Sequence, residues 1–410
     1  MTTTLRPPKL LPVLTFAAVL FAACLSAFAQ SSPRSAGQDQ DALIKDAAQS
    51  MMRGNMAQAE SDLNAVLKLS PEEYRALNML GMVKAQQQQN PEAEKIFKQV
   101  IRQKPDFASA YVNLGLLYLQ TSRIDDAVPQ FQEALRLAPG RADAMGPLLN
   151  AWAVQARTAA AAGELEKALS ILLQARKLSP KNPDVLYDFG MVALRMSLFP
   201  DAAAAFQGVL AVRPDDANAL YGLGRAQMSL HKYQDAAETF SHYVQHYPQD
   251  ASGHYALGVT LAALQRPSEA TAEFRRSIEI QPVQTESYFQ LGRICLDQDD
   301  LPCAADNFDR VLERDAHHAG ALGGKGRVEF QKKDYAKAAE LLQQSISVDA
   351  AVREPHYYLG LTYARMGRGA ESQAELQRAT EIEHAEVEGN RGVLKLLDSR
   401  GSSADTTQKP

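Results

Sequence analysis

Two histidines, His242 and His246, stand four residues apart, which places both imidazoles on one face of a helix. A pair of this kind can bind a metal ion such as zinc when further ligands lie nearby. The nearest third histidine is His254, and no carboxylate or thiol completes an obvious site close by in the sequence. We therefore expect the pair to face solvent, and we expect neither a metal nor another cofactor.

A second group of residues combines aromatic rings with arginines at helical spacing. Arg225 follows Tyr221 by four residues and Arg293 follows Phe289 by four, so each pair shares one helix face. Tyrosine and arginine are the residue types that dominate binding hot spots. The full set at the two corresponding positions is Tyr187, Tyr221, Arg225, Tyr255, Phe289, Arg293, Arg327 and Tyr357. Such a surface suits an extended peptide or a helix of a partner, with aromatics on apolar side chains and arginines on carboxylates.

Signatures of catalysis are missing from the sequence. The chain has no serine nucleophile elbow and no His-Glu-x-x-His pattern. Four glycines at 320, 323, 324 and 326 resemble a phosphate-binding loop, but no strand precedes them. The acidic residues are scattered in a way typical of solvated helix faces. We therefore expect a protein that is not an enzyme.

The composition excludes several other classes of protein. The 410 residues are 46% hydrophobic and 22% charged, close to the globular average, which argues against disorder over most of the chain. A net charge of −5 argues against a nucleic-acid partner, which calls for an electropositive face. Three cysteines are too few for a disulfide scaffold. A mean hydropathy of −0.28 excludes a polytopic membrane protein.

The elements that must position these residues repeat along the chain. Prolines recur with gaps of 34 residues, except for one gap of 41, at Pro71, Pro105, Pro139, Pro180, Pro214, Pro248 and Pro282. Small residues, mostly alanine, stand twelve positions before this slot, a Phe or Leu stands eight before it, and a glycine usually stands twenty-four before it. The spacing of apolar residues within each copy is helical. Proline ends the second helix of the seven copies that carry it, because it cannot continue a helix; the same slot continues as Ala316, Ala350 and His384.

This pattern resembles the tetratricopeptide repeat (TPR), a 34-residue pair of antiparallel helices. The resemblance covers residues 40–386 and implies an all-α fold, a right-handed α-solenoid of ten tandem repeats. The fourth copy is seven residues longer, so its first helix is expected to start near Ala142, and a bend is expected near 140–148. Residues 387–398 are expected to form a capping helix and residues 399–410 a disordered tail.

The resemblance also implies where the candidate residues lie. In this family the first helix of each pair lines the concave groove, so the aromatic and arginine set would line the groove of the C-terminal half. The alternative for the tyrosines is packing between repeats. Cys295 and Cys303 fall on the two helices of one pair, and a disulfide between them is one alternative. We favour two half-buried thiols, because only the position of Cys295 normally points into the helix interface.

The first residues carry an export signal. Basic residues precede the apolar run 10–29, which ends in Ala27-Phe28-Ala29, as a secretory signal peptide requires. We expect residues 1–29 to be cleaved and residues 30–39 to form a flexible linker. The alternatives are an uncleaved anchor and a lipoprotein box ending at Cys24, which would carry the lipid. All three place the chain outside the cytoplasm, in the periplasm or cell envelope.

These observations favour one function over two rivals. We expect a non-catalytic interaction scaffold of the bacterial cell envelope, whose groove binds a peptide or helix of a protein partner. The alternative is a lipoprotein-type assembly factor of an outer-membrane, pilus or polysaccharide export complex. An enzyme would need a further domain, and the residues beside the repeats are too few to form one.

Overall fold

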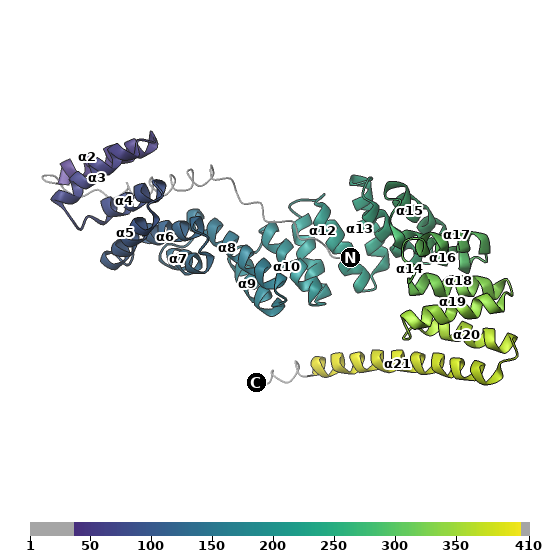
Figure 1. The fold of residues 1–410 in the computed structure, drawn as a ribbon. Coiled ribbons are helices and arrows are strands. Elements are labelled where there is room, and N and C mark those ends of the chain that lie inside the picture. Colours follow the sequence, from purple (N-terminus) through teal and green to yellow (C-terminus); the bar gives the residue numbers. More distant parts are fainter. Residues whose placement is uncertain (1–36, 403–410) are drawn as a thin grey trace. The chain divides into compact units, whose positions relative to one another are not determined.

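The computed structural model describes the backbone of residues 37–402 and the side chains of residues 40–385 (Figure 1). The expected signal peptide, the lipidation candidate Cys24 and residues 403–410 lie outside these described residues. Within them the chain forms twenty helices and no strand, so the all-α, α-solenoid expectation is correct. None of these helices combines the length and apolar character needed to cross a bilayer.

The chain divides into two compact units, residues 1–209 and 210–410. The helices that begin in unit 1 are α2 (Gly37–Met52), α3 (Met56–Leu69), α4 (Tyr74–Gln86), α5 (Asn90–Gln103), α6 (Ala108–Gln120), α7 (Ile124–Leu137), α8 (Ala142–Ala161), α9 (Leu165–Leu178), α10 (Pro183–Arg195) and α11 (Phe199–Leu210). Those of unit 2 are α12 (Ala217–Ser229), α13 (Tyr233–His246), α14 (Ala251–Ala263), α15 (Pro267–Ile280), α16 (Thr285–Asp297), α17 (Leu301–Leu312), α18 (Ala319–Gln331), α19 (Tyr335–Val348), α20 (Arg353–Arg365) and α21 (Gly369–Ser402).

The helices of unit 2 pack in consecutive pairs, α12 with α13, α14 with α15, and so on to α20 with α21. The first helices of successive pairs also contact one another, as α16 does with α18 and α18 with α20. Proline sets helix ends as expected. α15 begins at Pro267, where the missing N–H costs nothing, and α13 ends two residues before Pro248.

A residue in the left-handed region closes the turn inside each pair. Glycine fills this position three times, at Gly54, Gly163 and Gly367. At the other turns it is filled by Gln88, Ser122, Ser197, His231, Gln265, Asp299 and Lys333, with φ between 56° and 68°. These ten positions repeat the sequence spacing of 34 residues, with the same single gap of 41. The pattern was not predicted, because most of these residue types do not favour positive φ.

The extra seven residues of the fourth copy lie in α8. This helix has 20 residues, against 13 for α10, and begins at Ala142. Pro147 lies inside it, within its first turns, where few backbone hydrogen bonds are lost. The bend expected near 140–148 stays a prediction.

Two boundaries differ from the expected ones. α2 begins at Gly37, inside the expected linker 30–39. α21 runs without interruption from Gly369 to Ser402, so residues 387–398 continue this helix and do not form a separate capping helix. The first residues of the expected tail, 399–402, belong to it as well. No proline stands between Gly369 and Ser402 to end the helix.

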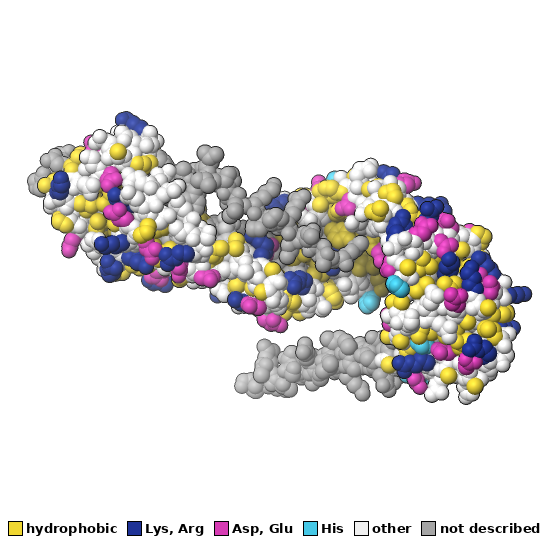
Figure 2. Space-filling model, in the orientation of Figure 1, with side chains coloured by type: hydrophobic (Ala, Val, Ile, Leu, Met, Phe, Trp, Pro, Cys, Tyr) yellow, Lys and Arg dark blue, Asp and Glu magenta, His cyan; other side chains and the backbone are white. Residues whose placement is uncertain are grey.

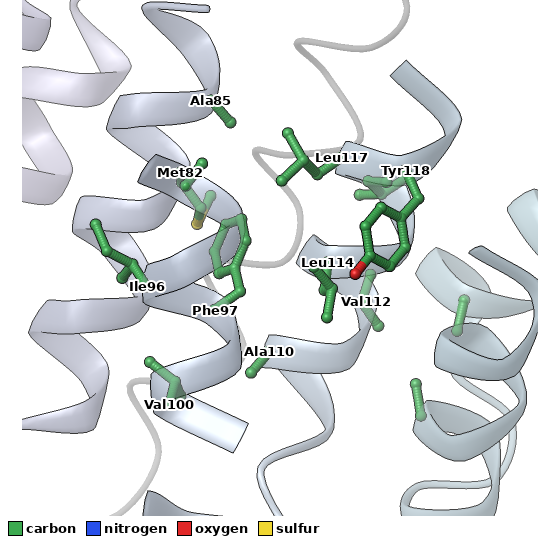
Figure 3. Close-up of a cluster of buried hydrophobic side chains, with 14 of the residues drawn as sticks. Met82, Ala85, Ile96, Phe97, Val100, Ala110, Val112, Leu114, Leu117 and Tyr118 are labelled. Carbon is green, nitrogen blue, oxygen red and sulfur yellow. The ribbon is translucent and has the colours of Figure 1, made fainter. Parts of the chain in front are cut away.

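The core follows one rule throughout both units. The Phe or Leu of each second helix, fully buried in every pair but the last, packs against the small residue of the first helix in its own pair. Figure 3 shows one case, Phe97 of α5, in a cluster with Met82 of α4 and with Ala110 and Leu114 of α6. A Cβ added at Gly81 would lie 2.6 Å from the Phe97 ring, so only glycine leaves room for it.

Candidate functional site

The candidate site in unit 2 is a set of side chains on its first helices, α12, α14, α16, α18 and α20. We call it the ladder face. It comprises Tyr221, Arg225, Tyr255, Phe289, Arg293, Arg327 and Tyr357. Tyr187, which the sequence also predicted, lies on α10 in unit 1, where it is half-buried with its ring 6.0 Å from that of Phe206.

The aromatic residues of the ladder face pack partly against the buried core of their own helix pairs. The rings of Tyr221, Tyr255 and Phe289 lie 5.7, 5.9 and 6.2 Å from the buried phenylalanine of their own pair. All three of these residues are half-buried, whereas Tyr357, the last aromatic residue of the ladder face, is 40% exposed. Each ring therefore stabilises its pair and still leaves an edge for a ligand.

The tyrosine hydroxyls lie in a partly desolvated environment. Burial raises the pKa of Tyr221, an effect that the nearby Arg225 opposes. Burial also raises the pKa of Tyr255, and the carboxylate of Glu286 adds to it, while Gln290 and Arg293 act in the opposite direction. The pKa of Tyr255 therefore depends on side chains of the following first helix, α16. The hydroxyls of Tyr221 and Tyr255 both stay protonated at neutral pH and can donate hydrogen bonds.

The three arginines differ in their availability. Arg225 is exposed and forms no ion pair with any described residue. Arg293 is exposed as well; its guanidinium lies 5.9 Å from the Phe289 ring centroid and 3.4 Å from Gln290 Oε1. These two cations are open to a carboxylate ligand.

Arg327 is already engaged within unit 2. Its Nη1 lies 3.4 Å from Asp297 Oδ1 and 3.2 Å from Glu354 Oε1, and its guanidinium stands 5.2 Å from the centroid of Tyr358. Its Nε is buried without a hydrogen-bond partner among the described residues. Arg327 therefore links α16, α18 and α20, and its charge is balanced before any ligand arrives.

The charges on the drawn face of unit 2 do not form a one-sign patch. On the face drawn in Figure 2, Lys and Arg side chains of unit 2 are interspersed with Asp and Glu and with hydrophobic side chains.

The structure joins Cys295 of α16 to Cys303 of α17 in a disulfide, with the two Cα atoms 5.8 Å apart. Our prediction of two separate thiols is therefore wrong. Cys303 reaches the interface because it stands in the first turn of α17, close to the end of α16. The bond ties together the hairpin that carries Phe289 and Arg293.

His254, the nearest third histidine, does not join His242 and His246. Its Nδ1 lies 2.6 Å from Glu273 Oε2 and its Nε2 lies 3.2 Å from the carbonyl oxygen of Pro248, with 7% of the residue exposed. His356 makes the same two contacts, with Glu375 and the Ala350 carbonyl. Both are structural histidines that hold the turn before their own helix.

A cleft that the sequence did not predict lies between α13 and α15, above α14. It has a volume of about 540 Å³. Its lining is Gln234, Ala237, Glu238, Ser241, His242, Gln245, Leu257, Leu261, Arg266, Glu269, Ala272 and Glu273. Because the walls come from two second helices, no single-helix pattern could have indicated it.

Unit 1 contains a buried carboxylate beside Tyr187. The side chain of Asp188 on α10 is 12% exposed, and its Oδ2 lies 2.9 Å from Nη1 of Arg157 on α8. Burial raises its pKa to about 6, more than the Arg157 charge lowers it. The unfolded value is 3.8, so the folded state binds this proton more tightly than the unfolded chain does.

The stability that this proton contributes is fully present below pH 4 and is lost as the pH rises through about 6. We expect Asp188→Asn to raise the free energy of unfolding relative to the parent chain by about 1–3 kcal/mol at pH 7.5, with little difference near pH 4. Denaturant unfolding across this pH range checks the prediction, with Asp201→Asn, an exposed aspartate on α11, as the control. A difference that does not change with pH would contradict it.

The comparison with family models identifies one family. A family model described as tetratricopeptide repeat matches residues 78–142, 187–251, 224–285 and 289–352, more than half of the chain. Superkiller complex protein 3 of Mus musculus is 43% identical over 70 residues, which is 16% of this chain; the match spans only 4% of that protein's length.

Several solved structures resemble the fold. YrrB, titled a TPR protein with an unusual peptide-binding site, is 24% identical, with 44% of this chain and 92% of that chain covered and a TM-score of 0.38. The Cut9–Hcn1 hetero-tetramer of APC/C is 13% identical, with coverages of 94% and 93% and a TM-score of 0.43. These likenesses describe the fold alone.

Proposed function

The chain belongs to the tetratricopeptide repeat family, and from that premise we propose that it is a protein–protein interaction scaffold that binds a peptide or a helix of a partner on the ladder face. Proteins of this family are generally non-catalytic scaffolds. A fold does not fix a function, so the proposal rests on the site.

One observation carries the proposal. Arg225 and Arg293 are exposed cations without an ion pair among the described residues, and each stands one helical turn from a half-buried aromatic ring. Arg327, by contrast, has two carboxylates within 3.4 Å. Unpaired arginines beside aromatic edges favour a ligand with acidic and apolar side chains.

The experiment uses a probe selected for the purpose. A random peptide library displayed on phage is selected on the purified chain, and the tightest sequence is synthesised with a fluorescent label. We expect the selected sequences to combine Asp or Glu with Leu, Ile or aromatic residues. Selection of basic sequences, or of none, would overturn the proposal.

We propose further that the scaffold acts outside the cytoplasm, in the bacterial cell envelope. The support is the sequence of residues 1–29, which has the order of charges, apolar run and small residues of a signal peptide. The alternative, a lipoprotein-type assembly factor of an export complex, rests on the Phe-Ala-Ala-Cys sequence that ends at Cys24.

Labelling with a radioactive fatty acid in a bacterial host distinguishes these two. A cleaved signal predicts a shortened chain that begins near Gln30 and carries no label. A lipoprotein predicts that the chain carries the label and that the label is lost in the Cys24→Ala variant. Full-length, unlabelled chain in the cytosolic fraction would contradict both.

A further inference from the structure

Three side chains of unit 2 converge at the open end of the α12–α13 hairpin. Asp215 lies in the turn before α12, and His242 and His246 stand one turn apart near the end of α13. The Nε2 atoms of the two histidines lie 3.0 and 3.4 Å from Asp215 Oδ1. One ligand atom from each of the three residues lies within 4.8 Å of the other two.

The hairpin itself brings these groups together. In a pair of helices joined by a short turn, the start of the first lies beside the end of the second. The hydroxyl of Tyr247 donates to the backbone carbonyl of Asp215 at 2.5 Å, which fixes this aspartate against the end of α13. The two imidazole rings lie 4.8 Å apart with their planes at 77°.

This arrangement matches a known coordination geometry. Ligand atoms held tetrahedrally at about 2.0–2.2 Å from zinc lie roughly 3.3–3.5 Å from one another. The two distances to Asp215 Oδ1 are already close to this value. Two imidazoles and one carboxylate suit zinc and neighbouring transition metals better than calcium or magnesium, which prefer oxygen ligands.

We propose that Asp215, His242 and His246 form a binding site for a divalent transition-metal ion of the zinc type. The side chains are 39–53% exposed, so they can rotate to close on the ion, and solvent can supply the remaining ligand. The ion would join the two ends of the hairpin opposite its turn at His231. The proposal does not rest on the proposed peptide binding, because it is argued from these three side chains alone.

A metal here would also act close to the ladder face. His242 and His246 flank Tyr243 on α13, whose ring lies 5.7 Å from that of Tyr221 on α12. Tyr243 in turn contacts Tyr247, with ring centroids 5.1 Å apart. The ion would thus fix the second-helix support on which Tyr221 rests.

The test titrates Zn²⁺ into the full chain by calorimetry, with no histidine tag and after removal of bound metal with EDTA. We expect one equivalent to bind, and we expect His242→Ala, His246→Ala and Asp215→Asn each to weaken binding by at least about tenfold. Replacement of Zn²⁺ by Co²⁺ should give the visible absorption of a low-coordinate site. Circular dichroism confirms that each variant is folded.

The matched control is His231→Asn, because His231 is another exposed histidine of the same hairpin and asparagine tolerates its positive φ. This variant should bind Zn²⁺ like the parent chain. Absence of a stoichiometric site, or equal binding by all variants, would overturn the proposal and leave a hydrogen bond of His242 and a close contact of His246 with Asp215. Loss in both histidine variants without loss in Asp215→Asn would overturn the three-ligand assignment.

Discussion

Replacement of Arg225 and Arg293 by glutamate should lower the affinity for the selected acidic peptide by about 30- to 1,000-fold, or roughly 2–4 kcal/mol. Each change removes a cation that has no ion-pair partner among the described residues and places a like charge opposite the peptide carboxylates. Fluorescence anisotropy with the labelled peptide measures the loss. Both side chains are exposed, so the variant should keep its helical content and its unfolding midpoint.

The matched control reverses two other exposed arginines of unit 2. Arg275 on α15 and Arg310 on α17 belong to second helices, and their change to glutamate alters the net charge by the same amount. This control should lower the affinity for the peptide only slightly, and added salt should abolish that small loss. An equal loss in both double variants would reduce the effect to net charge and remove the ladder face from the account.

Arg327 is left out of this test because it forms ion pairs with Asp297 and Glu354 within unit 2. A glutamate at this position would repel Asp297 and Glu354, whose carboxylates now lie 3.4 and 3.2 Å from Nη1 of Arg327. A loss of binding in that variant would therefore not separate ligand contact from damage to α16, α18 and α20.

Phe274→Ala should lower the free energy of unfolding of unit 2 by about 3–5 kcal/mol, as expected for truncation of a fully buried phenylalanine. Phe274 has 0% of its surface exposed and fills the space between Gly258 of α14 and Tyr255. Its loss also removes the support of one aromatic residue of the ladder face. Denaturant unfolding monitored by circular dichroism measures the effect.

Gly258, which faces Phe274, allows a second prediction about the same contact. In a helix interior, alanine in place of glycine normally stabilises by about 0.5–1 kcal/mol. A Cβ at Gly258, however, would lie 2.7 Å from the Phe274 ring, so Gly258→Ala should destabilise by roughly 1–3 kcal/mol.

Two other pairs of the chain combine alanine at this position with a smaller facing residue. Where alanine replaces the glycine, at Ala47 and Ala156, the facing residue is leucine, Leu63 and Leu172, and all four are buried. Gly258→Ala combined with Phe274→Leu should therefore cost less than the sum of the two single changes. Additive costs would show that the ring and the glycine do not depend on each other.

Much of the fold could be predicted because one unit is copied along the chain. The 34-residue spacing of Pro248, Phe274 and Gly258 with their counterparts fixes which residues end helices and which face inward. The left-handed residue in each hairpin turn could not be predicted in this way. Gln265 and Lys333 have no intrinsic preference for positive φ, and the packing of the two helices imposes it.

The candidate site was predictable only along single helices. Spacing of four residues gave Tyr221 with Arg225 and Phe289 with Arg293, since both members lie on one face. Contacts between helices decide the rest. The carboxylates that neutralise Arg327 stand 30 and 27 residues from it, and Asp215 meets His242 across 27 residues.

The central claim, that the first helices of unit 2 bind a peptide, is tested most directly by hydrogen–deuterium exchange of the full chain with and without the selected peptide. We predict slower amide exchange in α12, α14 and α16, which carry Arg225, Tyr255 and Arg293, and no change in α13, α15 and α17. Slowing confined to α13, α15 and α17 would place the peptide on the second helices and contradict the account.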